Sequence, residues 1–213
     1  MKIELENVRP MDIEKRSFEI ITQELSQMGK TLQEGTEPIV KRCIHTSADF
    51  DYADNLYFSD GAVEKALEAI RDGACIVTDT QMARSGINKR SLAKFGGEVF
   101  CFMSDEDVAA RARELGSTRA TVCMDKAAGL DQNLIFAIGN APTALVRLRE
   151  LIDDGFAPKL IIGVPVGFVN VVQSKELIME TDVPCIIAKG RKGGSNIAAC
   201  ICNALLYMLD NER

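Results

Sequence analysis

The chain contains one histidine, His45, and its position along the sequence suits acid–base chemistry. Histidine is the side chain whose ordinary pKa allows proton exchange near neutral pH. Arg42 and His45 are three residues apart, so a helix would place them on the same side. An apolar arc that includes Ile39 and Cys43 would lie on the opposite side. His45 is therefore predicted to face away from the core, either as a functional imidazole or as an exposed histidine without a role.

The residues around His45 favour a binding cleft. Four of the twelve Phe and Tyr residues follow it closely, namely Phe50, Tyr52, Tyr57 and Phe58. A neighbouring guanidinium favours the neutral imidazole, because a second positive charge is disfavoured there, and a bound carboxylate would reverse that bias.

A second candidate site is the segment Gly190–Ser195, with the sequence GRKGGS. It follows an apolar run and opens a helical pattern, so its backbone N–H groups and the helix dipole suit an anion, and Arg191 and Lys192 reinforce that charge. Its spacing matches neither a Walker A loop nor a Gly-x-Gly-x-x-Gly dinucleotide fingerprint. The alternative is a tight turn with solvated charges.

Two further segments carry weaker signals. Gly163–Phe168 (GVPVGF) is small, apolar and rich in turn residues. It suits a wall against a flat apolar ligand, or simply the end of a strand. Asp49, Asp51 and Asp54 have the alternate spacing of a calcium loop but lack its glycine and terminal glutamate, so no calcium site is predicted.

Apolar runs alternate with amphipathic patterns along the chain, which predicts the elements that position these residues. The predicted strands are 74–79, 98–103, 133–139, 160–165 and 184–189. Predicted helices cover 104–115, 141–153 and 195–209, with Ser104 and Ser195 as caps, and two earlier helices begin after Asp12 and Thr36. Residues 29–35 read as a loop.

This alternation predicts an α/β fold. We expect a single domain with a mainly parallel sheet of about five strands flanked by helices, preceded by an N-terminal helical segment. Residues 1–60 would carry the helices and aromatic loop around His45, and residues 61–213 the sheet core. In such sheets ligands bind beyond the carboxyl ends of the strands. Arg84, Arg191, Lys192 and Ser195 all lie in segments that follow predicted strands.

Composition excludes several classes of protein. The net charge is −6, and no block of basic residues exists, which argues against nucleic acid as a partner. No apolar run is long enough for a membrane span, and the N-terminus does not resemble a signal peptide, so a cytoplasmic protein is expected. The seven cysteines include no Cys-x-x-Cys pair. Cys200-x-Cys202 is a weak metal signal, so no metal site is predicted.

The residues alone thus indicate a strand-end cleft with dispersed cations, apolar walls and one imidazole, which suits a large, flat, polycarboxylated ligand. Several motifs resemble those of the precorrin-8X methylmutase family, whose other branch acts on cobalt-precorrin-8. The motifs are Arg42-x-x-His45, TDTQMARSGI (78–87), AIGNAPTAL (137–145), GVPVGFV (163–169) and GRKGGS (190–195). The resemblance runs from about Ser17 to Leu206.

The resemblance implies an isomerase of cobalamin biosynthesis that moves a methyl group from C-11 to C-12 of the macrocycle, giving hydrogenobyrinate or cobyrinate. It implies a homodimer with active sites near the subunit interface, His45 as the catalytic residue, and substrate contacts at Ser17 and Arg42. Arg84, Arg191, Lys192 and Ser195 are added as substrate-binding residues from their loop positions. No cofactor is expected, since any cobalt belongs to the substrate.

The chemistry agrees with these residues. A sigmatropic methyl shift moves no net electrons, and one general acid that protonates a ring nitrogen can assist it. Carboxylate arms on the macrocycle would explain cations spread over several loops. Two alternatives remain open, a non-catalytic corrinoid carrier and a nucleotide-binding enzyme that uses residues 190–195. Whether the substrate already carries cobalt also stays open.

Overall fold

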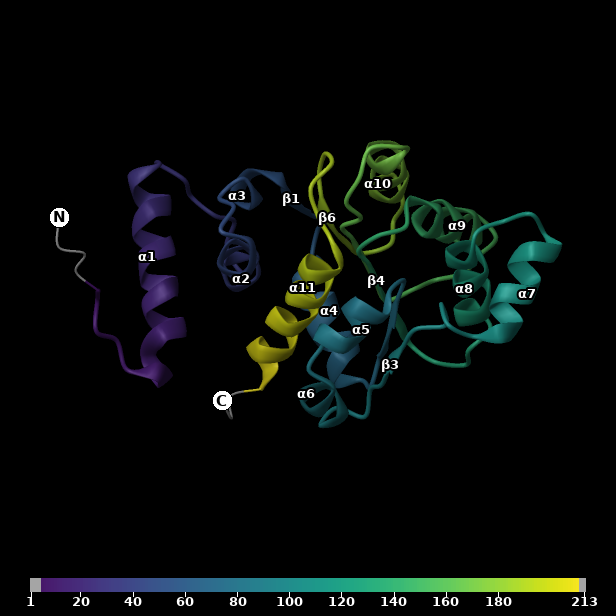
Figure 1. Ribbon diagram of the computed structural model, residues 1–213, viewed down its shortest axis with the longest axis horizontal. Coiled ribbons are helices and arrows are strands. Elements are labelled where there is room, and N and C mark those ends of the chain that lie inside the picture. Colours follow the sequence, from purple (N-terminus) through teal and green to yellow (C-terminus); the bar gives the residue numbers. More distant parts are fainter. Residues whose placement is uncertain (1–4, 211–213) are drawn as a thin grey trace.

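The computed structural model describes residues 5–210, and its centre is a six-stranded sheet (Figure 1). The strands are β1 (Leu56–Phe58), β2 (Cys75–Thr78), β3 (Val99–Phe100), β4 (Leu134–Ile138), β5 (Leu160–Gly163) and β6 (Cys185–Ala188). Their order is β1-β6-β5-β4-β2-β3, and every neighbouring pair is parallel except β1 with β6. The predicted α/β class is confirmed, with six strands in place of about five.

The additional strand is β1, which lies inside the aromatic segment after His45. It pairs antiparallel with β6, Leu56 opposite Ala188 and Phe58 opposite Ile186. A three-residue edge strand carries too few residues to show an alternating pattern, so no local pattern could predict it.

The helices surround this sheet on both faces (Figure 1). They are α1 (Ile13–Gln27), α2 (Glu37–Ser47), α3 (Tyr52–Asn55), α4 (Ala62–Arg71), α5 (Gln81–Gly86), α6 (Lys89–Ala93), α7 (Glu106–Glu114), α8 (Arg119–Ala128), α9 (Pro142–Asp153), α10 (Val171–Met179) and α11 (Ser195–Leu209), with a short 3-10 turn at Pro10–Asp12. None of the helices within residues 5–210 is long and apolar enough to cross a membrane.

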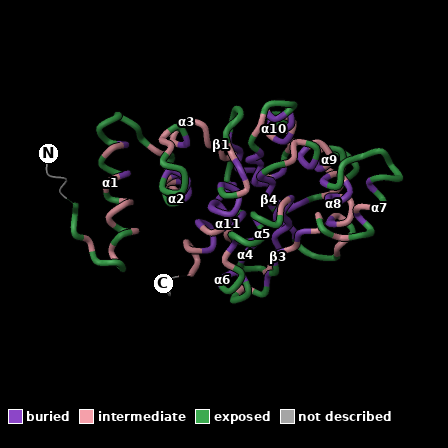
Figure 2. Tube along the Cα trace, viewed as in Figure 1, coloured by how far each residue is buried: buried purple, intermediate pink, exposed green. Residues whose placement is uncertain are grey.

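Alternation along the strands divides the core into two parts. In β4, Ile135 and Ala137 pack on one side, and Phe136 and Ile138 on the other. The first side is covered by α4, α5 and α11, and the second by α7 to α10. The four central strands β2, β4, β5 and β6 are buried at every position (Figure 2), which explains their continuous apolar sequences.

The N-terminal helices form an outer layer over the first side. α2 packs against α11, and α1 packs against α2 at the far side from the sheet (Figure 1). α1 buries only Ile21 and Leu25. Most of its surface is exposed or half-buried (Figure 2).

The predicted helix caps are wrong in their side-chain chemistry. They were Asp12, Thr36, Ser104 and Ser195. Asp12 and Thr36 do occupy N-cap positions, but neither side chain caps its helix, and the Thr36 hydroxyl donates instead to the Gln33 carbonyl. α7 begins after Asp105, while the Ser104 hydroxyl accepts from Gln81. Ser195 is the first helical residue, after Gly194 at the N-cap position, and its hydroxyl pairs with that of Thr80 from another loop.

Candidate active site

His45 lies near the end of α2 with its side chain exposed, as the helical periodicity predicted. The ring of Phe18, from α1, lies 5.4 Å from the imidazole centroid at a tilt of 36°. Three residues later Ala48 adopts a left-handed conformation, with φ 54°, and ends the helix. The imidazole is therefore open to a ligand on one side and supported by an aromatic ring on another.

Arg42 lies one turn before His45 and is held from three directions. Its guanidinium lies 5.2 Å from the ring centroid of Phe18 and 5.0 Å from that of Tyr207, and it donates to a Glu14 carboxylate oxygen at 2.5 Å. Cation–π contacts and a carboxylate partner both restrict a guanidinium. Arg42 is thus a fixed cation at the wall of a pocket of about 550 Å³ between α1, α2 and the end of α11.

Ser17 precedes Phe18 on α1 and is half-buried. Its hydroxyl donates to the Ile13 carbonyl one turn earlier. The structure thus brings Ser17, Arg42 and His45 to the same pair of helices, and we refer to them with Phe18 as the helix cluster.

The sequence alone did not predict the three residues that hold Arg42, which are Glu14, Phe18 and Tyr207. Glu14 and Phe18 are four residues apart on α1, so helical spacing could have placed them on one face. Nothing local to Tyr207 could have indicated its contact with Arg42, because that contact joins distant parts of the chain.

The aromatic segment after His45, interpreted from the sequence as favouring a cleft, packs partly into the core. Tyr52 is buried, and burial raises the pKa of its phenol to about 12. Phe50 and Phe58 pack against the core beneath α2 and α11, and Tyr57 packs on the opposite side of the sheet. Tyr52 thus belongs to the core around β1, and the other three rings are half-buried at its edge.

Asp79 is the main structural residue at the carboxyl ends of the strands. It is fully buried and follows β2. One carboxylate oxygen accepts from the N–H of Gly139 at 2.9 Å, and the other accepts from Asn140 and Ala141 at 2.8 and 2.6 Å. Burial raises the pKa of Asp79, and the three N–H bonds oppose that rise. Asp79 thereby fixes the loop after β4 to the end of β2.

Glycines allow the neighbouring strand-end loops to approach each other closely. A Cβ at Gly139 would lie 2.6 Å from the Cα of Ser195, and one at Gly193 would lie 2.0 Å from the Val164 carbonyl oxygen. The Gly194 N–H donates to the same Val164 carbonyl at 2.8 Å. The loops after β4, β5 and β6 therefore form one packed unit, which we call the strand-end surface.

Replacing Gly139 with alanine is expected to lower the free energy of unfolding by about 1–3 kcal/mol, because the new methyl group overlaps the backbone of α11. Urea unfolding measures this change. Gly129→Ala is the matched control, since its Cβ would meet nothing closer than 3.5 Å at an ordinary φ of −82°. Equal stability of both variants would contradict the close packing at Gly139.

The predicted cations of the strand-end surface have different partners. Arg84, on α5, donates to the Val99 carbonyl at 3.3 Å. The Arg191 guanidinium lies 5.2 Å from the ring centroid of Phe168 and is exposed. Both residues keep donor groups available for an anionic ligand.

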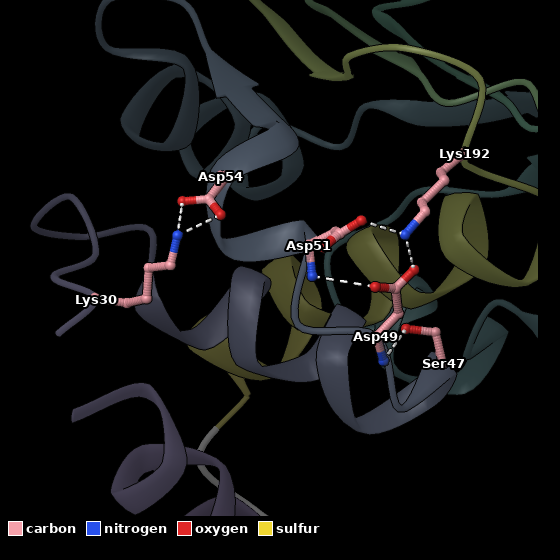
Figure 3. Close-up of polar contacts among 6 residues, drawn as sticks. All are labelled: Lys30, Ser47, Asp49, Asp51, Asp54 and Lys192. Carbon is pink, nitrogen blue, oxygen red and sulfur yellow. Dashed lines mark hydrogen bonds and ion pairs between the residues drawn. The ribbon is translucent and has the colours of Figure 1, made fainter. Parts of the chain in front are cut away.

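Lys192 is already paired. Its ammonium binds Asp49 and Asp51, at 2.6 and 2.5 Å, in the segment that follows α2 (Figure 3). These hydrogen bonds raise the pKa of Lys192 and lower that of Asp49. A second pair, Lys30 with Asp54, lies nearby (Figure 3). Lys192 therefore ties the loop after β6 to the end of α2, close in sequence to His45.

Exposed apolar side chains surround these cations. Met82, Val166, Phe168 and Val169 are all large hydrophobic residues with at least 49% of their surface exposed. Met82 follows β2 and the other three follow β5, and Val166 and Phe168 belong to the segment 163–168 for which a wall was one of two predictions. The strand-end surface thus combines apolar contact area with arginine side chains.

The helix cluster and the strand-end surface lie at different positions along the axis of α11. Ser195 opens this helix at the strand ends, and Tyr207, beside Arg42, follows twelve residues later, or about 18 Å along the axis. Thr46, next to His45, donates to the Cys200 sulfur, only five residues from Ser195. His45 is therefore the member of the helix cluster nearest to the strand ends along α11.

All seven cysteines are buried free thiols. No group of three or more His, Cys, Asp or Glu residues within 5–210 is arranged to hold a metal ion.

Comparisons with known proteins agree with this arrangement. The family model described as precorrin-8X methylmutase matches residues 12–208. The cobalt-precorrin-8 methylmutase of Salmonella typhimurium is 46% identical, over 94% of this chain and 96% of the relative, and that of Priestia megaterium is 44% identical, over 96% and 90%. The crystal structure of a precorrin-8X methylmutase from Thermus thermophilus superposes with a TM-score of 0.83 at 40% identity, covering 92% of this chain and 96% of that one.

Proposed function

The chain belongs to the precorrin-8X methylmutase family, and from that premise we propose that it isomerises cobalt-precorrin-8 in cobalamin biosynthesis. The observation that carries this proposal is the identity of 46% and 44% to two cobalt-precorrin-8 methylmutases over nearly the whole of both chains. The reaction would move a methyl group from C-11 to C-12 of the macrocycle and give cobyrinate.

His45 is the proposed general acid. Its imidazole is exposed and is supported by Phe18, and it is the one histidine of the sequence. Protonation of a ring nitrogen withdraws electron density from the carbon that loses the methyl group, which lowers the barrier to migration. The shift moves no net electrons, so the chemistry requires no redox cofactor, and cobalt would arrive as part of the substrate.

Substrate binding is proposed to use both cations and apolar surface. Arg42 and Ser17 would contact the macrocycle near His45. Arg84, Arg191 and Ser195 would receive carboxylate arms at the strand ends, where Met82 and Phe168 offer apolar contact. Lys192 would join them through the third N–H of its ammonium, since the other two bind Asp49 and Asp51.

A homodimer is proposed as the active form. α1 lies outermost, with Met11 and Ile13 exposed at its beginning and Met28 exposed just after its end. Such apolar side chains on an outer helix suit a subunit contact. A partner subunit would also supply cover for His45, which a single chain leaves open to solvent.

The test is conversion of the precursor by the purified protein. Mixing with cobalt-precorrin-8 should change the absorption spectrum to that of cobyrinate, with many turnovers per protein chain. A corrinoid carrier would give at most one equivalent of spectral change and no product after the protein is denatured. A parallel reaction with metal-free precorrin-8X shows whether cobalt is required, and a melting-temperature increase with ATP or NAD would favour the nucleotide-binding alternative.

A further inference from the structure

Lys175 is a buried lysine to which the proposed mechanism assigns no part. It lies on α10 with 1% of its surface exposed. Its ammonium donates to the carbonyls of Gly190 at 2.8 Å and Lys192 at 2.9 Å. No carboxylate within residues 5–210 forms an ion pair with it, and burial lowers its pKa to about 8. A buried cation without a counter-ion is costly for the fold.

The two carbonyls belong to the loop between β6 and α11. In a trans peptide the C=O and N–H groups point in opposite directions, and the described chain contains no cis peptide. The N–H groups of Arg191 and Gly193 share peptide units with those carbonyls, so they point away from Lys175. Neither N–H donates to an acceptor of the described chain.

We propose that Lys175 is a positioning residue that draws the carbonyls of Gly190 and Lys192 inward and thereby presents the N–H groups of Arg191 and Gly193 to a carboxylate of the substrate. The inference rests on the proposed function and goes beyond it, because it assigns the anion-binding face of this loop to a residue on a different helix. The positive charge of the Lys175 ammonium, next to this loop, would also attract the carboxylate.

Other parts of the loop agree with this role. The Arg191 carbonyl accepts from the N–H of Gly167, and the Gly194 N–H donates to Val164, so the loop is also tied to the segment after β5. Gly190 has φ 74° and Gly193 has φ 152°, which other residues rarely adopt. The loop therefore holds a particular conformation whose interior is occupied by one ammonium group.

Lys175→Met tests the proposal, because methionine keeps much of the length and apolar character while removing the charge and the donors. We expect KM for cobalt-precorrin-8 and Kd for cobyrinate to rise by roughly tenfold or more, with a smaller change in kcat, since the loop binds an arm of the substrate remote from the migrating methyl group. Hydrogen exchange should accelerate at the N–H groups of Gly167 and Gly194.

Lys175→Gln keeps N–H donors without charge, and its KM should lie between those of the wild type and the methionine variant. If the methionine variant does not fold, KM, Kd and hydrogen exchange of the glutamine variant test the proposal instead. Lys159→Met, at an exposed lysine before β5, is the matched control and should leave KM unchanged.

A folded Lys175→Met protein with the KM, Kd and exchange rates of the wild type would overturn the proposal. If the wild-type protein neither binds nor converts the corrinoid, the proposed function fails, while accelerated exchange at Gly167 and Gly194 in the variant would still show that Lys175 positions the loop.

Discussion

Replacing His45 with alanine should lower kcat for cobalt-precorrin-8 by about 10²- to 10⁴-fold, which is the usual contribution of a general acid. The affinity for cobyrinate should change little, because Arg42 and the strand-end cations remain. His45 is exposed, so the free energy of unfolding should change by no more than about 0.5 kcal/mol. Single-turnover spectra, equilibrium titration with cobyrinate and urea unfolding measure the three quantities.

His45→Gln separates the acid from other contributions of the side chain. Glutamine keeps a hydrogen-bond donor of similar reach but cannot deliver a proton. It should therefore be as slow as the alanine variant. Wild-type turnover in the alanine variant would refute any catalytic role, and wild-type turnover in the glutamine variant alone would reduce the role of His45 to hydrogen bonding.

The largest effect on stability is expected at Asp79. In Asp79→Asn an NH₂ group replaces one carboxylate oxygen, so at least one backbone N–H faces another donor instead of an acceptor. The remaining amide oxygen is uncharged, so its hydrogen bonds to the loop are weaker. Leaving a buried donor without an acceptor costs about 1–3 kcal/mol, so the variant should lose about 3 kcal/mol in total. Relief of the burial cost that raises the pKa of Asp79 offsets part of this loss.

Urea unfolding at neutral pH measures this change, with Asp79→Ala expected to be less stable still, since it leaves all three N–H groups without their acceptor. Asp60→Asn, at an exposed aspartate, is the control and should lie within about 0.5 kcal/mol of the wild type. An asparagine variant as stable as the wild type would show that water or a shifted loop replaces the carboxylate. Activity should fall with stability, because Asp79 holds the loop that packs on Ser195.

The elements that sequence predicted well are those whose pattern is local. The strands near residues 75, 135, 161 and 186 are continuous apolar runs because helices cover both of their faces. The exposed position of His45 followed from the 3.6-residue period of α2 alone. Residues 29–35, between α1 and α2, are also outside helices and strands, as their polar sequence indicated.

The sequence misled where one pattern has two explanations. Aromatic residues after His45 suit a cleft wall and a core equally, and only the tertiary packing shows that Tyr52 is buried while Phe50 is half-buried. A serine before a helical pattern suits a cap, yet the hydroxyl of Ser195 has a better partner in Thr80, from a loop 115 residues earlier.

By itself the sequence determined the α/β class, the family, and the presence of one imidazole beside one arginine, because composition, period and motif are properties of neighbouring residues. Tertiary structure alone decided that Asp79 organises the loop after β4, that Phe18 and Tyr207 enclose Arg42, and that Lys175 holds the loop after β6. Each of these contacts joins separate elements, and its energy depends on burial and on the partner that folding supplies. No local pattern carries that information.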